Sequence, residues 1–246
     1  MGPMFMCRTK IRFSGGETAE FASFIKEALS EDRYPNDWGK DWLGNIPLYA
    51  GADEDDFRLD AGDDKARFVA SRFRLCEEDD FRDVDDYIRS RYYCRGVVSE
   101  MDDSALKDNV FYLNTQTTWV PMIGMFKDVM EMKGFKGITI DYYADEPVYD
   151  ILEATDYYSP SWDYTVACHT LDWRFEKLCG YRHSEYWNEA DLLKELQYIY
   201  GNKDINECIA LAENEDFLCY VYEDQDFDHG DCIRIRKIKK LESIKA

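Results

Sequence analysis

The chain opens with a short alternating run that leads directly into a helical stripe. In residues 9–13, Ile11 and Phe13 occupy one face of a predicted strand, and the Ser-Gly-Gly that follows ends it. Apolar side chains then recur at helical spacing over 17–29, at Phe21, Phe24, Ile25, Ala28 and Leu29. This stripe is typical of a helix packed on a sheet, so the chain is expected to fold as a sheet covered by helices.

The same two patterns recur and predict a topology. Further strands are expected at 66–75, 109–116 and 137–143. Pro121 suits the first turn of a second helix, because its missing N–H costs nothing there, and apolar side chains follow it at helical spacing. The order β-α-β-β-α-β is the split arrangement of the ferredoxin-like fold, an antiparallel sheet with two helices on one face. The predicted fold class is α+β.

The second half of the chain is expected to extend this sheet and then to form an appendix. Strand-like runs at 147–153 and 163–169 would extend the sheet. Beyond them lie predicted helices at 189–200 and 204–212 and predicted strands at 217–222 and 231–238. The expected organisation is a ferredoxin-like domain over 1–170, with an acidic insertion at 76–108, followed by an α/β appendix over 171–246.

Acidic residues greatly outnumber basic ones. The 246 residues include 51 Asp and Glu against 30 Lys and Arg, a formal charge of −21. Spread evenly over an expected surface of ~11,000 Å², this is one net charge per ~540 Å², about fivefold sparser than on duplex DNA. Only a face on which the acids gather could imitate a nucleic-acid backbone, so the position of the acids matters more than their total.

The acids do gather, in three blocks. Residues 53–64 hold seven acids and one Arg, residues 77–86 hold seven acids and one Arg, and residues 213–231 hold eight acids and no Lys or Arg. These segments are called the first, second and third acidic blocks below. Two interpretations that involve no partner molecule stay open. Charge runs are often only solvated loops, and the basic tail 232–246 could pair with acids of the same chain.

Composition otherwise indicates a folded protein of the cytoplasm. Hydrophobic residues make up 45% and aromatic residues 15% of the chain, too much for a disordered acidic tail. The chain has no apolar run of 18 residues and no signal-peptide pattern, so no membrane association is expected. The eight scattered cysteines are expected to be reduced thiols of the core.

Three short motifs occur in a characteristic order. They are Cys-Arg-Thr-Lys-Ile-Arg-Phe-Ser-Gly at 7–15, Trp-Gly-Lys-Asp-Trp at 38–42 and Thr-Thr-Trp-Val-Pro at 117–121. Together they resemble the YubB-type ferredoxin-like domain family, over roughly residues 5–155, although Thr9 stands where that family usually has Asn. Members occur on phages, plasmids and other mobile elements. The resemblance therefore implies the same fold and a mobile-element setting in a bacterial host.

Three tryptophans in or beside these motifs allow two interpretations. Trp38, Trp42 and Trp119 could form a platform on which bases stack. Alternatively, a Trp ahead of a helix closes the open end of a small core. Few Lys or Arg lie near these residues, and a molecule with a charge of −21 repels a polyanion. A core role and no direct contact with nucleic acid are therefore predicted.

A metal site is the next possibility. Cys168, His169, Cys179 and His183 supply four zinc-ligand types within 16 residues, and Cys-x3-His is an acceptable half-site. However, Cys168 and His169 are adjacent in a predicted strand, so their side chains would point to opposite faces. The run 224–230 begins like a calcium loop but has His229 where such loops need Gly. No metal or cofactor is predicted.

Catalytic signatures are missing as well. The chain contains no Gly-x-Gly-x-x-Gly, no Gly-x4-Gly-Lys-Ser/Thr and no Gly-x-Ser-x-Gly motif. Acid pairs are too numerous for two of them to be chosen as a catalytic pair, so the chain is not expected to be an enzyme. The alternative hypothesis is a metal-dependent enzyme or zinc-binding module that uses the Cys168/His169/Cys179/His183 cluster. A scaffold whose charge serves only solubility is a third.

The favoured hypothesis is a protein of a phage or other mobile element that inhibits a nucleic-acid-handling host defence system, of the anti-CRISPR or anti-restriction type. Its acidic blocks would enter a basic channel meant for DNA or RNA, so the expected partner is a basic nucleic-acid-binding host protein or complex. The predicted contact residues are Asp53, Glu54, Asp55, Asp56, Glu77, Glu78, Asp79, Asp80, Asp83, Asp85, Asp86, Asp224, Asp226 and Asp228.

Overall fold

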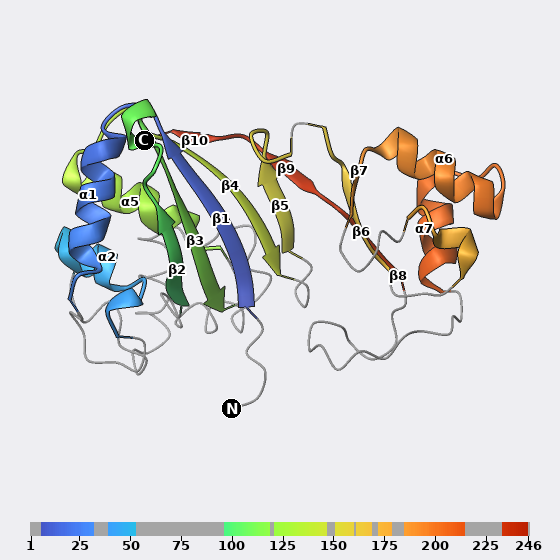
Figure 1. Cartoon of the computed structure of the whole chain (residues 1–246), viewed down its shortest axis with the longest axis horizontal. Coiled ribbons are helices and arrows are strands. Elements are labelled where there is room, and N and C mark those ends of the chain that lie inside the picture. Colours follow the sequence, from blue (N-terminus) through green and yellow to red (C-terminus); the bar gives the residue numbers. More distant parts are fainter. Residues whose placement is uncertain are drawn as a thin grey trace, which may run out of the picture. The chain divides into compact units, whose positions relative to one another are not determined.

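The computed structural model of the chain has an α+β fold, as the sequence predicts (Figure 1). It describes residues 6–31, 39–52, 96–118, 121–146, 151–159, 161–168, 172–178, 185–214 and 233–245. The chain forms two compact units, one of residues 1–158 with 241–246 and one of residues 159–240. The boundary expected after residue 170 assigns the strand at 164–168 to the first domain, whereas this strand pairs within the second unit.

An antiparallel sheet organises the first unit. Its four central strands follow the order β2 (Gly96–Asp102), β3 (Val110–Thr118), β1 (Met6–Ser14) and β4 (Thr139–Glu146). Three further strands bring the sheet to seven: β5 (Ile151–Thr155) and β9 (Lys239–Leu241) continue the order, and β10 (Ile244–Lys245) pairs with β4. The sheet is thus larger than the predicted ferredoxin-like core with its two added strands.

Helices cover one face of this sheet. Figure 1 shows α1 (Thr18–Ala28), α2 (Asn45–Ala50) and α5 (Ile123–Lys133) together on the same side of β1–β4. Two single-turn helices complete the unit, η1 (Gly39–Asp41) and η4 (Leu106–Asp108). The helices predicted at 17–29 and after Pro121 are therefore confirmed, whereas no helix was predicted where α2 lies.

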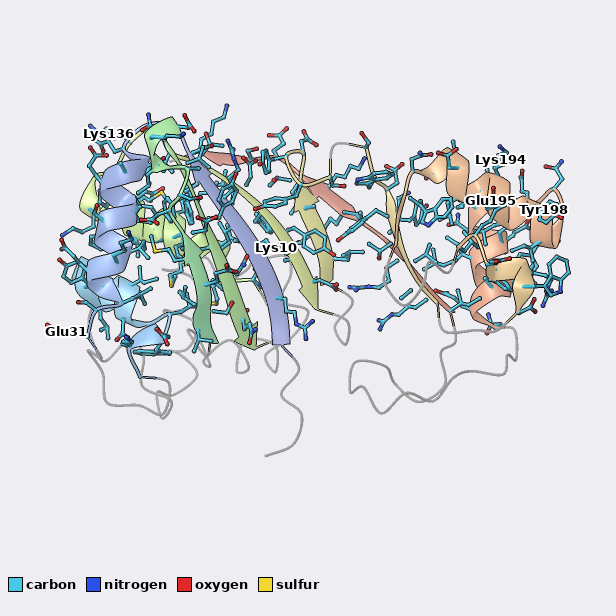
Figure 2. All side chains as sticks on the ribbon, viewed as in Figure 1. Lys10, Glu31, Lys136, Lys194, Glu195 and Tyr198 are labelled. Atoms are coloured by element: carbon cyan, nitrogen blue, oxygen red, sulfur yellow. The ribbon has the colours of Figure 1, made fainter. Side chains whose placement is uncertain are left out.

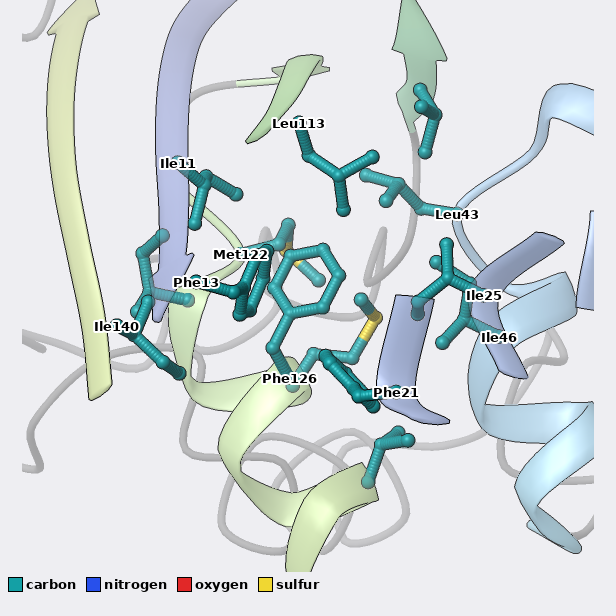
Figure 3. Packing of buried hydrophobic residues seen from close by; sticks show 14 of the residues in the cluster. Ile11, Phe13, Phe21, Ile25, Leu43, Ile46, Leu113, Met122, Phe126 and Ile140 are labelled. Carbon is teal, nitrogen blue, oxygen red and sulfur yellow. The ribbon is translucent and has the colours of Figure 1, made fainter. Parts of the chain in front are cut away.

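Aromatic, aliphatic and methionine side chains fill the space between helices and sheet (Figure 3). Phe13 of β1 stacks on Phe111 of β3 with ring centroids 4.6 Å apart. Phe21 of α1 and Phe126 of α5 each meet Phe13 edge to face at 5.4 Å. Each such pair contributes about 0.5–1.5 kcal/mol beyond the burial of its area. Side chains from β3, α1 and α5 therefore all pack against the ring of Phe13 on β1.

The turn between β1 and α1 depends on glycine. Gly15 and Gly16 have φ angles of +80° and +45°, which side-chain-bearing residues rarely adopt. The Thr18 hydroxyl donates a hydrogen bond to the Gly15 carbonyl, and the Lys136 N–H donates to the Glu17 carboxylate at 2.9 Å. The start of α1 is thereby fixed against the turn that precedes β4.

Strand β2 is the main departure from the sequence-based topology. The second strand was predicted at 66–75, which lies outside the described residues, and residues 96–102 were assigned to the acidic insertion. In the structure this run pairs with β3, with a register shift between Val98 and Glu100. The shift interrupts strict alternation, and an irregularity of this kind hides a strand from a period-two search.

The second unit is a smaller α/β assembly. Its sheet has the order β7 (Glu185–Trp187), β6 (Tyr164–Cys168), β8 (Ile233–Lys237), with both pairings antiparallel. Three helices accompany it: η5 (Trp173–Phe175), α6 (Glu189–Tyr200) and α7 (Ile205–Glu213). Both long helices were predicted, and so were β6 and β8; the strand predicted at 217–222 lies outside the described residues.

Helix ends in this unit follow ordinary capping rules. Asn188 accepts a hydrogen bond from the Asp191 N–H at the start of α6, and Asp204 with Glu207 forms a capping box at the start of α7. The apolar stripes of both helices bury Leu192, Leu196 and Cys208 against β6 and β8.

In the part of the chain that the structure describes, no helix has the length and apolar character needed to cross a bilayer.

Candidate functional site

The face of the first sheet opposite the helices carries a polar surface. Along β1, Cys7, Thr9, Ile11 and Phe13 are buried in the core, so the residues between them lie on the other face. Those residues include three cations, Arg8, Lys10 and Arg12. We call this side the open face of the sheet.

Two cross-strand rows span the open face. The first row runs from Glu100 on β2 through Asn114 on β3 to Lys10 on β1. The second row begins at Asp102 on β2 and runs through Tyr112, Arg12 and Asp141 on β3, β1 and β4. Neighbours in a row sit directly opposite each other, a position from which their side chains interact.

A hollow of about 300 Å³ lies over these rows. Its walls combine one ammonium, two carboxylates, one amide and three phenols, from Lys10, Glu100, Asp102, Asn114, Tyr112, Tyr157 and Tyr158. All seven belong to the first unit. Figure 2 labels Lys10 on β1, whose side chain is exposed. Among the described residues, nothing forms a hydrogen bond or ion pair with its ammonium group.

Hydrogen bonds hold both carboxylates of the hollow in place. The Asn114 amide donates to Glu100 Oε2 at 2.7 Å, and the Ser104 N–H donates to Asp102 Oδ1 at 2.9 Å. Hydrogen bonds from the backbone and side chain of Ser104 lower the pKa of Asp102. Asp102 therefore keeps its negative charge throughout the neutral range.

The three phenols form the aromatic part of the hollow. The Tyr112 and Tyr157 hydroxyls lie 3.4 Å apart, and the Tyr157 and Tyr158 rings meet edge to face at 5.1 Å. The hydrogen bond with Tyr112 raises the pKa of Tyr157, and burial raises the pKa of Tyr158. Both phenols stay neutral at physiological pH, so they offer ring faces and hydroxyls but no basic oxygen.

One side of the Tyr157 ring is already in contact with a cation. The Arg12 guanidinium lies 4.3 Å from the ring centroid, and its Nη1 donates to Asp141 Oδ2 at 3.0 Å. Tyr157 is nevertheless 48% exposed. The surface beside the hollow thus displays a guanidinium bound between a tyrosine ring and a carboxylate.

All fourteen predicted contact residues, in 53–56, 77–86 and 224–228, lie outside the described residues. From the third block the structure describes Glu213, whose Oε1 accepts a hydrogen bond from the Ile235 N–H of β8 at 3.1 Å.

Basic residues of the C-terminal segment contact acids outside the acidic blocks. Lys240 Nζ lies 2.8 Å from Asp163, and Lys237 Nζ lies 3.5 Å from Glu189. The pKa of Asp163 is lowered, first by the hydrogen bond from Lys240 and next by that from the Glu189 N–H. These two lysines are therefore engaged within the second unit.

The tryptophan and metal hypotheses are tested only in part. Trp42 is 6% exposed and packs in the core of the first unit, as predicted, while Trp38 and Trp119 lie outside the described residues. Cys168 belongs to β6, and the other three members of the Cys/His cluster lie outside the described residues. Across the described ranges, no three His, Cys, Asp or Glu side chains are grouped as metal ligands. Cys7 and Cys208 are buried free thiols.

The hollow was not identified from the sequence. Lys10 lies in the motif at 7–15 and Tyr112 lies in the strand predicted at 109–116, but neither was predicted as a site residue. Tyr157 and Tyr158 follow β5 without any pattern, and β2 was not predicted. Only strand pairing brings these residues together.

Comparison with protein-family models, with curated proteins and with solved structures yields no match.

Proposed function

We propose that this protein binds a basic nucleic-acid-handling protein of a bacterial host through its acidic blocks and thereby inhibits a defence system of the anti-CRISPR or anti-restriction type. One observation carries this proposal. The three blocks contain 22 of the 51 acidic residues and only 2 of the 30 basic residues, which leaves 29 acids against 28 bases in the rest of the chain. Almost all of the net charge therefore belongs to the blocks.

Ion pairs among the described residues support this interpretation. Arg12 with Asp141 in the first unit, and Lys240 with Asp163 in the second, are pairs between acids and bases that both lie outside the blocks. Lys237 and Glu189 are another. Cations engaged in this way do not need the acidic blocks as partners, which favours a role for the blocks toward another molecule.

The physical basis is exchange of counterions. A groove lined by Lys and Arg holds mobile anions, and a fixed array of carboxylates displaces them just as a nucleic-acid backbone would. Association driven in this way is fast at low ionic strength and weakens steeply as salt rises. Occupation of the groove excludes DNA or RNA from the partner.

We further propose that the first unit is a ferredoxin-like domain of the YubB-type family, carried by a phage or other mobile element. The strand order β2-β3-β1-β4, with α1 between β1 and β2 and α5 between β3 and β4, supports the fold. The motif at 7–15 covers most of β1, and the first two residues of the motif at 117–121 end the adjacent strand β3. The added strands β5, β9 and β10 would then be elaborations of this core.

Inhibition of purified DNA-cleaving host defence nucleases tests the function directly. Cleavage by a panel of restriction and RNA-guided nucleases would be measured with the protein at increasing concentrations, at 50 mM and at 300 mM salt. We expect at least one enzyme to be inhibited at low salt and released at high salt. A variant with the seven acids of the second block replaced by Lys should lose inhibition by at least a hundredfold, since it reverses that block's charge.

The matched control keeps the negative charge of the second block and changes only the length of four acidic side chains. It carries Glu77→Asp, Glu78→Asp, Asp79→Glu and Asp80→Glu and should inhibit almost as well as the unmodified protein. Circular dichroism of both variants establishes that the fold is retained. Inhibition that survives the Lys substitutions, or that does not depend on salt, would exclude electrostatic mimicry by the second block.

A further inference from the structure

We propose that the hollow on the open face of the first sheet binds an arginine side chain of a protein partner. The inference rests on the proposed function only for the origin of that arginine, which a basic nucleic-acid-binding protein supplies in abundance. The site itself is defined by Glu100, Asp102, Tyr112, Tyr157 and Tyr158, all within the first unit.

Charge selects the class of ligand. The hollow holds two carboxylates and one ammonium, so its net charge is negative. Asp102 stays ionised because hydrogen bonds from Ser104 lower its pKa, and Glu100 is anchored by Asn114 through Oε2. A phosphate or carboxylate ligand would face both acids and meet one cation in the lining, Lys10. A cation gains from both acids and can displace the exposed, flexible Lys10 side chain.

The aromatic walls distinguish arginine from a simple ammonium ion. A guanidinium is planar, so it stacks on a tyrosine ring and donates hydrogen bonds from its edge at the same time. The protein already contains one example of this arrangement. Arg12 lies over the Tyr157 ring at 4.3 Å while donating to Asp141 at 3.0 Å. The hollow offers the same two elements, tyrosine rings and carboxylates, around open space of about 300 Å³.

The register places the acids where a guanidinium can reach both. Glu100 and Asp102 are two residues apart on β2, beyond the register shift, and so share one face of the strand. Tyr112 sits opposite Asp102 on the neighbouring strand and Asn114 sits opposite Glu100. An arginine entering from solvent would lie across these two rows, with its stem against the phenol rings.

A titration with N-acetyl-arginine-methylamide, followed in ¹H–¹⁵N spectra of the full chain, tests the site. The matching citrulline derivative is nearly isosteric but neutral and serves as the ligand control. We expect saturable shifts of the Asn114 side-chain amide with the arginine probe, at millimolar affinity, and none with citrulline. The double variant Glu100→Gln/Asp102→Asn should weaken binding by about tenfold, in line with the loss of two solvent-exposed charge interactions.

Three further variants keep the inference falsifiable. Glu20→Gln/Asp41→Asn removes the same charge from exposed positions outside the hollow and should leave the affinity unchanged. Tyr157→Phe should retain most of the binding and Tyr157→Leu should lose it, because only the former keeps the ring. Lys10→Met should strengthen binding about twofold to threefold, since it removes a like charge. Spectra of the free variants establish that each is folded.

Contrary results are equally specific. Equal shifts with citrulline, or weaker binding after Lys10→Met, would overturn the arginine site and indicate a neutral or anionic ligand. Failure here leaves the proposed function intact, since nuclease inhibition by the second acidic block is measured without the probe. Conversely, the Lys variant of the second block should still bind the arginine probe even if no nuclease is inhibited.

Discussion

The Arg12 guanidinium lies 3.0 Å from the Asp141 carboxylate, at directly paired positions of β1 and β4. Asp141 is only 4% exposed and also accepts a hydrogen bond from the Ser243 hydroxyl at 2.5 Å. Because β10 follows Ser243 and pairs with β4, this carboxylate joins the first strand, the fourth strand and the C-terminal segment. Side chains from β1 and from the C-terminal segment therefore both bind the Asp141 carboxylate.

Replacement of Asp141 by Asn should lower the free energy of unfolding by about 3 kcal/mol, because it leaves the poorly solvated Arg12 without its counter-ion. Urea denaturation followed by circular dichroism measures the change. The double variant Arg12→Met/Asp141→Leu should recover most of the loss, since no charge is then left without a partner. A loss below about 1 kcal/mol for the single variant would mean that solvent screens this pair as it screens a surface ion pair.

The turn that precedes α1 should not tolerate a side chain. Gly16 has a φ angle of +45°, and a Cβ there would overlap the Lys136 carbonyl oxygen and approach the Gly137 oxygen to 2.7 Å. Gly16→Ala is expected to cost about 3 kcal/mol, from left-handed strain together with this overlap. Gly134→Ala is the matched control, because Gly134 has a φ of +76° and open space around it. It should cost only about 1 kcal/mol. Equal losses in thermal or urea unfolding would rule out the steric contribution.

The capping box of α7 should contribute measurably to the second unit. Asp204 accepts a hydrogen bond from the Glu207 N–H at 2.9 Å and Glu207 accepts one from the Asp204 N–H at 3.4 Å. Asp204→Ala should destabilise the protein by about 1 kcal/mol in urea unfolding, whereas Asp204→Asn should be close to neutral because Asn caps a helix equally well. A large loss with Asn would instead indicate a requirement for the negative charge.

Acid should weaken the second unit through Asp163. Hydrogen bonds from Lys240 and from the Glu189 N–H hold the pKa of this carboxyl below its ordinary value of 3.8. A lowered pKa in the folded state means that the stabilisation is fully present above pH 3.8 and is lost as the pH falls through the lower, folded-state value.

Thermal unfolding of Asp163→Asn across the pH range measures this contribution. The variant should be less stable than the unmodified protein at pH 6, and the two should converge in acid. Glu176→Gln changes an exposed acid of the same unit and should follow the unmodified protein throughout. A difference between Asp163→Asn and the unmodified protein that persists unchanged below pH 3 would contradict an electrostatic cause.

The spacing of apolar residues along the chain was sufficient to predict most helices and strands. The segments 17–29 and 189–200 predict α1 and α6, because their apolar residues recur every three to four positions. This spacing places them on one face of a helix, where they can be buried together. Period-two alternation likewise predicts β1 at Ile11 and Phe13. The same rule places Lys10 and Arg12 on the polar side of that strand without saying what they meet there.

Long-range pairing decided the rest. Strand β2 carries a register shift, and α2 is only six residues long and packs with α1 and α5, so neither has a clear local period. The ion pair between Arg12 and Asp141 spans 129 positions, and the hollow unites residues from Lys10 to Tyr158. Amino-acid order alone determined the solvent-facing and core-facing sides of the elements with a regular apolar period, such as β1 and α1, and the concentration of charge in three blocks. Which side chains became neighbours depended on strand order and register, because hydrogen bonding between distant segments sets those and no local period encodes them.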